Sequence, residues 1–186
     1  MKRIKNVLQV IRAIMIYPGI SWDDNRFIAD LKRWKTICNM SDFSDFMTFA
    51  VLMSEKKEFR NLFIYRNRKR PLFRRIVSVL YRPLQSLFIE AGEIGGGLFI
   101  QHGFATMIAA ESIGENCWIN QQVTVGYRGT SMRPPVIKDN VMITCGAKVL
   151  GDIVVGNNAV IGANAVVIHD VADNATMVGV PAKRIK

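Results

Sequence analysis

A six-residue period governs the C-terminal half of the sequence and constrains the fold more than any other feature. Aliphatic residues recur, mostly six positions apart, at Ile94, Ile100, Ile113, Ile119, Val125, Ile137, Ile143, Val149, Val155, Ile161 and Val167. A second ladder of small or apolar residues lies four positions after the first. Neither an α-helix nor an antiparallel hairpin array repeats every six residues. The period therefore predicts a triangular solenoid of parallel strands, in which each hexad forms one short strand and one corner.

Two interruptions break this period. Ile113 follows Ile100 by thirteen positions instead of twelve, and Ile137 follows Val125 by twelve instead of six. The second interruption places about six extra residues in the segment 127–135, which we expect to leave the coil as a loop. Loops on repeat scaffolds tend to line a binding face.

The N-terminal half has a different, helical period. We expect a helical region over residues 1–90 and a solenoid over residues 91–186. Two helix starts are expected at side chains that can accept hydrogen bonds from a helix N-terminus. The candidates are Ser21 or Asp23 for the first helix and Ser41 or Ser44 for the second. The fold class predicted from both halves is mainly β, with an N-terminal α-helical region.

Positive charge is concentrated in one segment. The formal net charge is +10, and residues 56–84 hold ten Lys and Arg against Glu58 alone. Nucleic-acid binding is disfavoured because no nucleic-acid-binding fold accompanies the segment. Two interpretations stay open: a helical face whose cations are solvated or paired in an oligomer, and contact with an anionic membrane surface.

Cysteine usage and the first residues bear on the compartment. Cys38, Cys117 and Cys145 are an odd number without framework spacing, which favours a reducing compartment. Arg12 interrupts the apolar run near the N-terminus, so a helix is favoured over a signal peptide. We expect a cytoplasmic protein, with peripheral contact at the inner face of the membrane if the basic segment binds lipid.

Only two histidines are present. His102 follows Ile100 by two positions and shares its place in the hexad with Gln121, Cys145 and Ala163, so these residues should form a column along one edge of the solenoid. An imidazole can act as a general base near neutral pH, and this register favours catalysis over a packing role. His169 is expected to be solvated or packed against a loop. Two histidines cannot form a three-histidine zinc site, so no metal is expected.

The residues 100–126 (IQHGFATMIAAESIGENCWINQQVTVG) and the following repeats resemble the serine acetyltransferase branch of the hexapeptide-repeat acyltransferases. The resemblance covers about residues 90–186 and implies a left-handed parallel β-helix, acetyl-CoA as co-substrate and a homotrimer. It implies that His102 is the catalytic base. By the same resemblance, CoA is bound by Cys145, Gly146, Ala163, Lys183 and Arg184.

Two departures from the serine enzymes affect the acceptor. Gln101 stands where they have an aspartate before the histidine, and Pro134 stands where they have a second histidine. Neutral hydrogen-bonding groups for a sugar hydroxyl are predicted at Gln101, Gln121, Gln122 and Tyr127. We therefore expect an O-acetyltransferase of surface or capsular polysaccharide biosynthesis, acting on a glycan acceptor. The alternatives are serine O-acetylation for cysteine biosynthesis, N-acetylation of an amino-sugar nucleotide and a non-catalytic assembly module.

Overall fold

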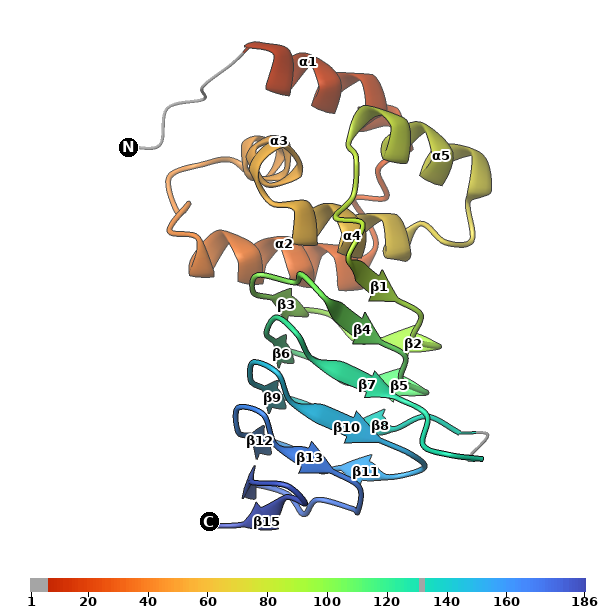
Figure 1. Cartoon of the computed structure of the whole chain (residues 1–186). Coiled ribbons are helices and arrows are strands. Elements are labelled where there is room, and N and C mark those ends of the chain that lie inside the picture. The colour runs from red at the N-terminus through yellow and green to blue at the C-terminus, as the bar shows by residue number, and fades with distance from the viewer. Residues whose placement is uncertain (1–6, 131–132) are drawn as a thin grey trace. The chain divides into compact units, whose positions relative to one another are not determined.

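The computed structural model describes residues 7–130 and 133–186, and its chain divides into two compact units (Figure 1). The first unit is Met1–Leu84 and the second is Gln85–Lys186. The solenoid begins slightly before the six-residue period does, because β1, Leu87–Ile89, already pairs in parallel with β4, Thr106–Ile108. No helix among the described residues is long and apolar enough to cross a bilayer.

The first unit is helical. Its elements are α1 Val7–Ile16, the 3₁₀ turn η1 Tyr17–Gly19, α2 Asn25–Ile37, α3 Asp45–Glu55, α4 Lys57–Arg66 and α5 Pro71–Leu80. The N-cap of α2 is Asp24, whose carboxylate accepts hydrogen bonds from the N–H groups of Arg26 and Phe27, so the predicted caps Ser21 and Asp23 are wrong. Ser44 caps α3 by accepting from the Met47 N–H at 3.3 Å, which agrees with one of the two candidates.

Aromatic side chains and one ion pair fill the interior of the helical unit. Phe49 lies 5.9 Å from Phe27 and 5.1 Å from Phe63, measured between ring centroids, in edge-to-face arrangements. The Arg66 guanidinium donates two hydrogen bonds to Asp30, at 2.8 and 3.0 Å. Both side chains of the pair are at least 96% buried. The ion pair therefore joins α2 to α4 within the apolar core.

The second unit is the predicted parallel β-helix. Its strands are β1, β2 Glu93–Ile94, β3 Phe99–Ile100, β4, β5 Ser112–Ile113, β6 Trp118–Ile119, β7 Thr124–Gly126, β8 Val136–Ile137, β9 Met142–Ile143, β10 Lys148–Leu150, β11 Val154–Val155, β12 Val160–Ile161, β13 Val166–Val167, β14 Thr176–Val178 and β15 Lys183–Arg184. They form three parallel sheets, except that β15 returns antiparallel to β14. The aliphatic ladder points inward and is buried. This confirms the mainly β fold class.

The corners carry backbone conformations that side chains rarely adopt. Asn116, Asn140, Asn158 and Asn174 each have a positive φ, close to +57°, at equivalent corners of successive coils. Asparagine tolerates this left-handed region better than most residues. The second interruption of the period lies between β7 and β8 as predicted, although residues 131–132 of that loop lie outside the described residues.

The buried ion pair generates a stability prediction. Replacing Arg66 by Met strands the Asp30 carboxylate in the core, and we expect the free energy of unfolding to fall by about 3–5 kcal/mol. The matched control is Lys35→Met, which removes the exposed pair that joins Lys35 to Asp45 at 3.0 Å. It should cost about 1 kcal/mol or less. Equal losses in urea denaturation would contradict the account of the core.

Candidate active site

The register of the coils places the predicted column on one edge of the β-helix. Four ladder residues pair in parallel from coil to coil. They are Ile100, Ile119, Ile143 and Ile161. Gln121, Cys145 and Ala163 each follow a ladder residue by two positions and occupy equivalent corner positions in consecutive coils, where strand spacing separates neighbours by about 4.8 Å. His102 follows Ile100 by two positions at the corner before them.

The corner at His102 contains two residues more than the corner stacked on it. Seven residues separate Ile100 from Ile108, where five separate their partners Ile119 and Val125. Two residues of this longer corner are left-handed, His102 at φ +54° and Ala105 at φ +51°, whereas the corner stacked on it has one, Gln122 at φ +59°. A left-handed conformation costs an ordinary residue roughly 1–2 kcal/mol. Strain of this kind concentrates at functional sites.

The extra residues also change the backbone hydrogen bonds of this corner. In the next step of the column, Gln121 accepts from the Gly146 N–H at 3.0 Å. At the first corner, the Gln122 N–H instead donates to Phe104, at 3.0 Å. The His102 carbonyl accepts from the Phe104 N–H at 2.5 Å. His102 is therefore displaced from the coil-to-coil pattern that its position in the period would give it.

The side chains at positions 101, 121 and 122, in the two corners at this end of the column, are uncharged, although the Lys148 ammonium group donates to the Gln122 carbonyl at 2.6 Å. His102 is exposed, and Gln101 before it accepts a hydrogen bond from the Asn120 amide at 3.1 Å. The Gln121 Oε1 atom is buried without a hydrogen-bond partner among the described residues. A buried acceptor without a donor is unfavourable unless a ligand supplies the donor. Gln121 is thus a ready acceptor beside His102, and the exposed Gln122 follows it.

Small residues continue the column away from His102. Cys145 is partly buried, and Gly146 has φ +73°. A Cβ atom at Gly146 would lie 2.0 Å from Asn164 Oδ1, so this corner accepts only glycine without rearrangement. Ala163 is the corresponding small residue of the next coil, so the side chains along this edge are short.

The predicted cations stand at the far end of the same sheet. Lys183 pairs with Val178 across β14 and β15, and Val178 follows the same register as Gly162 one coil earlier. Lys183 and Arg184 are both exposed. Positive charge therefore ends the face that begins next to His102.

Three residues lie elsewhere. Tyr127 is exposed at the opposite end of β7 from Gln122, so its predicted place on the His102 edge is wrong within one chain. Pro134 belongs to the loop that precedes β8, and the exposed His169 follows β13 at another corner. The described residues contain no group of three His, Cys, Asp or Glu side chains placed to hold a metal ion.

Sequence reasoning missed two features of this site. One is the left-handed backbone at His102, and the other is the unpartnered oxygen of Gln121. The thirteen-position spacing after Ile100 was a partial signal for the first, because it shows only the net change. The step from Ile100 to Ile108 is two positions longer than the six-residue period, and the step from Ile108 to Ile113 is one position shorter. No sequence signal indicates the second.

Comparisons with known proteins agree with the repeat. Residues 134–169 match the family described as bacterial transferase hexapeptide (six repeats). A serine acetyltransferase of Synechococcus elongatus is 41% identical over 119 residues, which cover 62% of this chain and 49% of the relative. A serine acetyltransferase of Bacillus licheniformis is 42% identical over 120 residues, covering 62% and 56%. The chain spans about half the length of these relatives.

Solved structures of similar fold match 96% of the chain. One is a serine acetyltransferase of Brucella abortus in complex with coenzyme A, which is 25% identical with a TM-score of 0.68. The match covers 96% of this chain and 79% of the Brucella chain. Another serine acetyltransferase in complex with CoA is 26% identical, with a TM-score of 0.61. This match covers 96% of this chain and 83% of the other chain. These relatives contradict the prediction of a polysaccharide O-acetyltransferase, which is therefore wrong.

The strained corner generates a prediction on stability. Glycine has no Cβ to clash in the left-handed region, so His102→Gly should be more stable than His102→Ala by about 1 kcal/mol. The order should reverse at Gln121, where Gln121→Gly should be less stable than Gln121→Ala by roughly 0.5–1 kcal/mol. Urea denaturation of the four variants measures both differences. The same order at both positions would refute the strain at His102.

Proposed function

We propose that this member of the hexapeptide-repeat transferase superfamily transfers an acetyl group from acetyl-CoA to the hydroxyl group of serine. The observation that carries the proposal is the strained, exposed His102 at the foot of a column of small residues. The identity to serine acetyltransferases supports serine as the acceptor. The CoA complexes of similar fold support the co-substrate.

His102 is proposed as the general base. Acetyl-CoA supplies the acetyl group as a thioester. His102 removes the proton from the serine hydroxyl as that oxygen forms a bond to the thioester carbonyl carbon. The carbon–sulfur bond then breaks, and the imidazolium returns its proton to the departing CoA sulfur. The products are O-acetylserine and free CoA, and no acyl-enzyme is required.

Backbone N–H groups of the column are the proposed partners for the charge that develops on the carbonyl oxygen. The N–H groups of Gln121 and Cys145 donate no hydrogen bond within the described residues, whereas the Gly146 N–H is engaged with Gln121. Donors that are fixed before the reaction stabilise developing charge without reorganisation. The coil-to-coil register holds Gln121 and Cys145 in place.

Neutral groups near His102 have a role in binding serine. The unpartnered Gln121 Oε1 is positioned to accept a hydrogen bond from an ammonium group. Gln101 supplies no charge, because its amide stands where the serine enzymes have a carboxylate. Gln122 completes the set of proposed acceptor-binding residues. Cys145, Gly146 and Ala163 are proposed to line the CoA chain, and Lys183 and Arg184 to bind its phosphates.

Several expectations stay predictions. They are the homotrimer, the cytoplasmic location and the contact of residues 56–84 with an anionic membrane surface. A trimer would add a neighbouring chain to the edge that carries His102, because symmetric oligomers repeat the same interface.

The acceptor is tested by the release of free CoA. Purified protein with acetyl-CoA should release CoA when serine is added, and mass spectrometry should detect O-acetylserine. Alanine, which lacks only the hydroxyl, is the matched control and should give no release above the background. Release that is equal with serine and alanine would indicate hydrolysis and would reject serine as the acceptor.

The base is tested by a substitution that keeps the backbone. Asparagine tolerates a positive φ, so His102→Asn should preserve the fold while it removes the imidazole. We expect turnover to fall by roughly 10²- to 10⁴-fold, the usual contribution of a general base, with little change in the affinity for CoA. His169→Asn is the control and should retain wild-type turnover. The proposal fails if His169→Asn is the more damaging change.

A further inference from the structure

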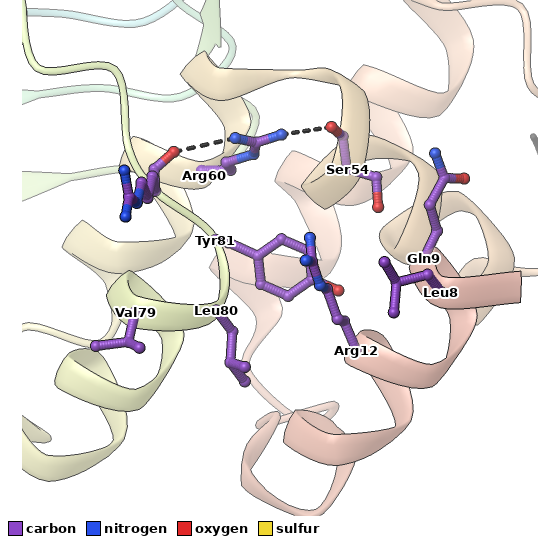
Figure 2. Close-up of a pocket in the computed structure, with 9 residues that line it drawn as sticks. Leu8, Gln9, Arg12, Ser54, Arg60, Val79, Leu80 and Tyr81 are labelled. Carbon is purple, nitrogen blue, oxygen red and sulfur yellow. Dashed lines mark hydrogen bonds between the residues drawn. The ribbon is translucent and has the colours of Figure 1, made fainter. Parts of the chain in front are cut away.

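The helical unit contains a cavity. The proposed reaction does not use this cavity. Its volume is about 520 Å³, within the range of small-molecule sites (Figure 2). Residues of α1, α3, α4 and α5, together with the segment that follows α5, line it. They are Leu8, Gln9, Arg12, Ser54, Arg60, Val79, Leu80, Tyr81 and Arg82. This set contains three arginines and no acidic residue.

Arg60 is fixed at the wall of the cavity by backbone carbonyls. Its guanidinium donates to Met53 at 2.5 Å, to Ser54 and to Arg82 at 3.0 Å. These bonds leave part of its donor capacity unused, since a guanidinium has five N–H groups. No lining residue is acidic, although the Glu58 carboxylate outside the lining also acts on Arg60, and Arg12 is exposed at the same cavity. The lining residues therefore carry a net positive charge.

Tyr81 adds a neutral donor. Its side chain is 2% exposed, and its hydroxyl has no hydrogen-bond partner among the described residues. The Ser54 side chain lies near enough to influence the phenol, but no bond of normal geometry joins the two hydroxyls. Burial raises the pKa of Tyr81 to about 12, although Arg12 and Arg60 act in the opposite direction. The phenol is therefore protonated at neutral pH and can donate a hydrogen bond.

Figure 2 shows these groups together: the Arg12 side chain lies next to the Tyr81 ring, and the hydrogen bonds of Arg60 are drawn above them in this view. Gln9 also has a buried Oε1 atom without a partner, and its amide can turn an oxygen or an N–H₂ group toward a ligand. Val79 is 72% exposed and Leu8 53% exposed, which gives the cavity an apolar rim. The lining thus combines cations, an unused hydroxyl donor and exposed aliphatic side chains.

We propose that this cavity binds a phosphate group. Guanidinium groups match the geometry of phosphate oxygens, and an additional neutral donor from a tyrosine suits the remaining oxygen acceptors. Two sources carry this chemistry: a soluble phosphate compound and a phospholipid headgroup whose acyl chains meet the apolar rim. The ligand would connect α1 to α5 through Arg12 and Tyr81, so its binding should also stabilise the helical unit.

Two mild variants test the site in the full-length chain. Arg12→Gln removes an exposed charge, and Tyr81→Phe removes one oxygen without a change in the ring. The matched control is Arg75→Gln, which removes an exposed arginine of α5 outside the cavity. Each cavity variant should weaken phosphate binding on the order of tenfold, the effect of one hydrogen bond to a charged group, and Arg75→Gln should leave it unchanged.

Two binding measurements distinguish the sources. Isothermal titration with inorganic phosphate at low ionic strength reports the soluble source. Co-sedimentation with vesicles of phosphatidylcholine alone, and of phosphatidylcholine mixed with phosphatidylglycerol, reports the headgroup. Binding in either measurement that falls in Arg12→Gln and Tyr81→Phe but not in Arg75→Gln supports the proposal. Absence of binding in both, or binding that the two cavity variants leave unchanged or that Arg75→Gln weakens equally, overturns it.

Discussion

Backbone hydrogen bonding between successive coils is the interaction on which the β-helix and its candidate site depend. Each short strand pairs in parallel with the strand one coil away, so the position of one corner fixes the next. The buried aliphatic ladder keeps this register, because a shift by one residue would turn it outward. The corner residues Gln121, Cys145 and Ala163 are therefore placed by the whole stack and not by their immediate neighbours.

The corner after β3, which contains His102, departs from this register. Two extra residues lengthen the corner after β3 and leave His102 in a left-handed conformation. The strain is small beside the ladder, since full burial of one aliphatic side chain contributes about 1.5–3 kcal/mol. The stack can thus hold one strained histidine in a fixed place. That is the arrangement a general base requires, because effective proton transfer depends on position.

The period predicted the solenoid and the column because both follow from side-chain spacing alone. Tyr127 was placed wrongly although the period bears on it, since Tyr127 follows Val125, whose sheet differs from that of Ile100. The basic segment was ambiguous: Arg66 pairs with Asp30 in the core and Arg70 donates to the Gly19 carbonyl at 2.6 Å, which composition does not reveal. The acceptor was predicted wrongly because two differences from the serine enzymes, at Gln101 and Pro134, were given more weight than the similarity of the remaining repeats.

The central claim is that acetyl-CoA occupies the column that ends at His102, and Cys145 reports on it directly. Cys145 is partly exposed in the column, while Cys38, also partly exposed, belongs to the helical unit. Alkylation of each thiol can be followed by mass spectrometry with and without acetyl-CoA. At ligand concentrations about ten times the dissociation constant, modification of Cys145 should slow by roughly tenfold and that of Cys38 should not change. Unchanged modification of Cys145 under saturating acetyl-CoA would contradict the account.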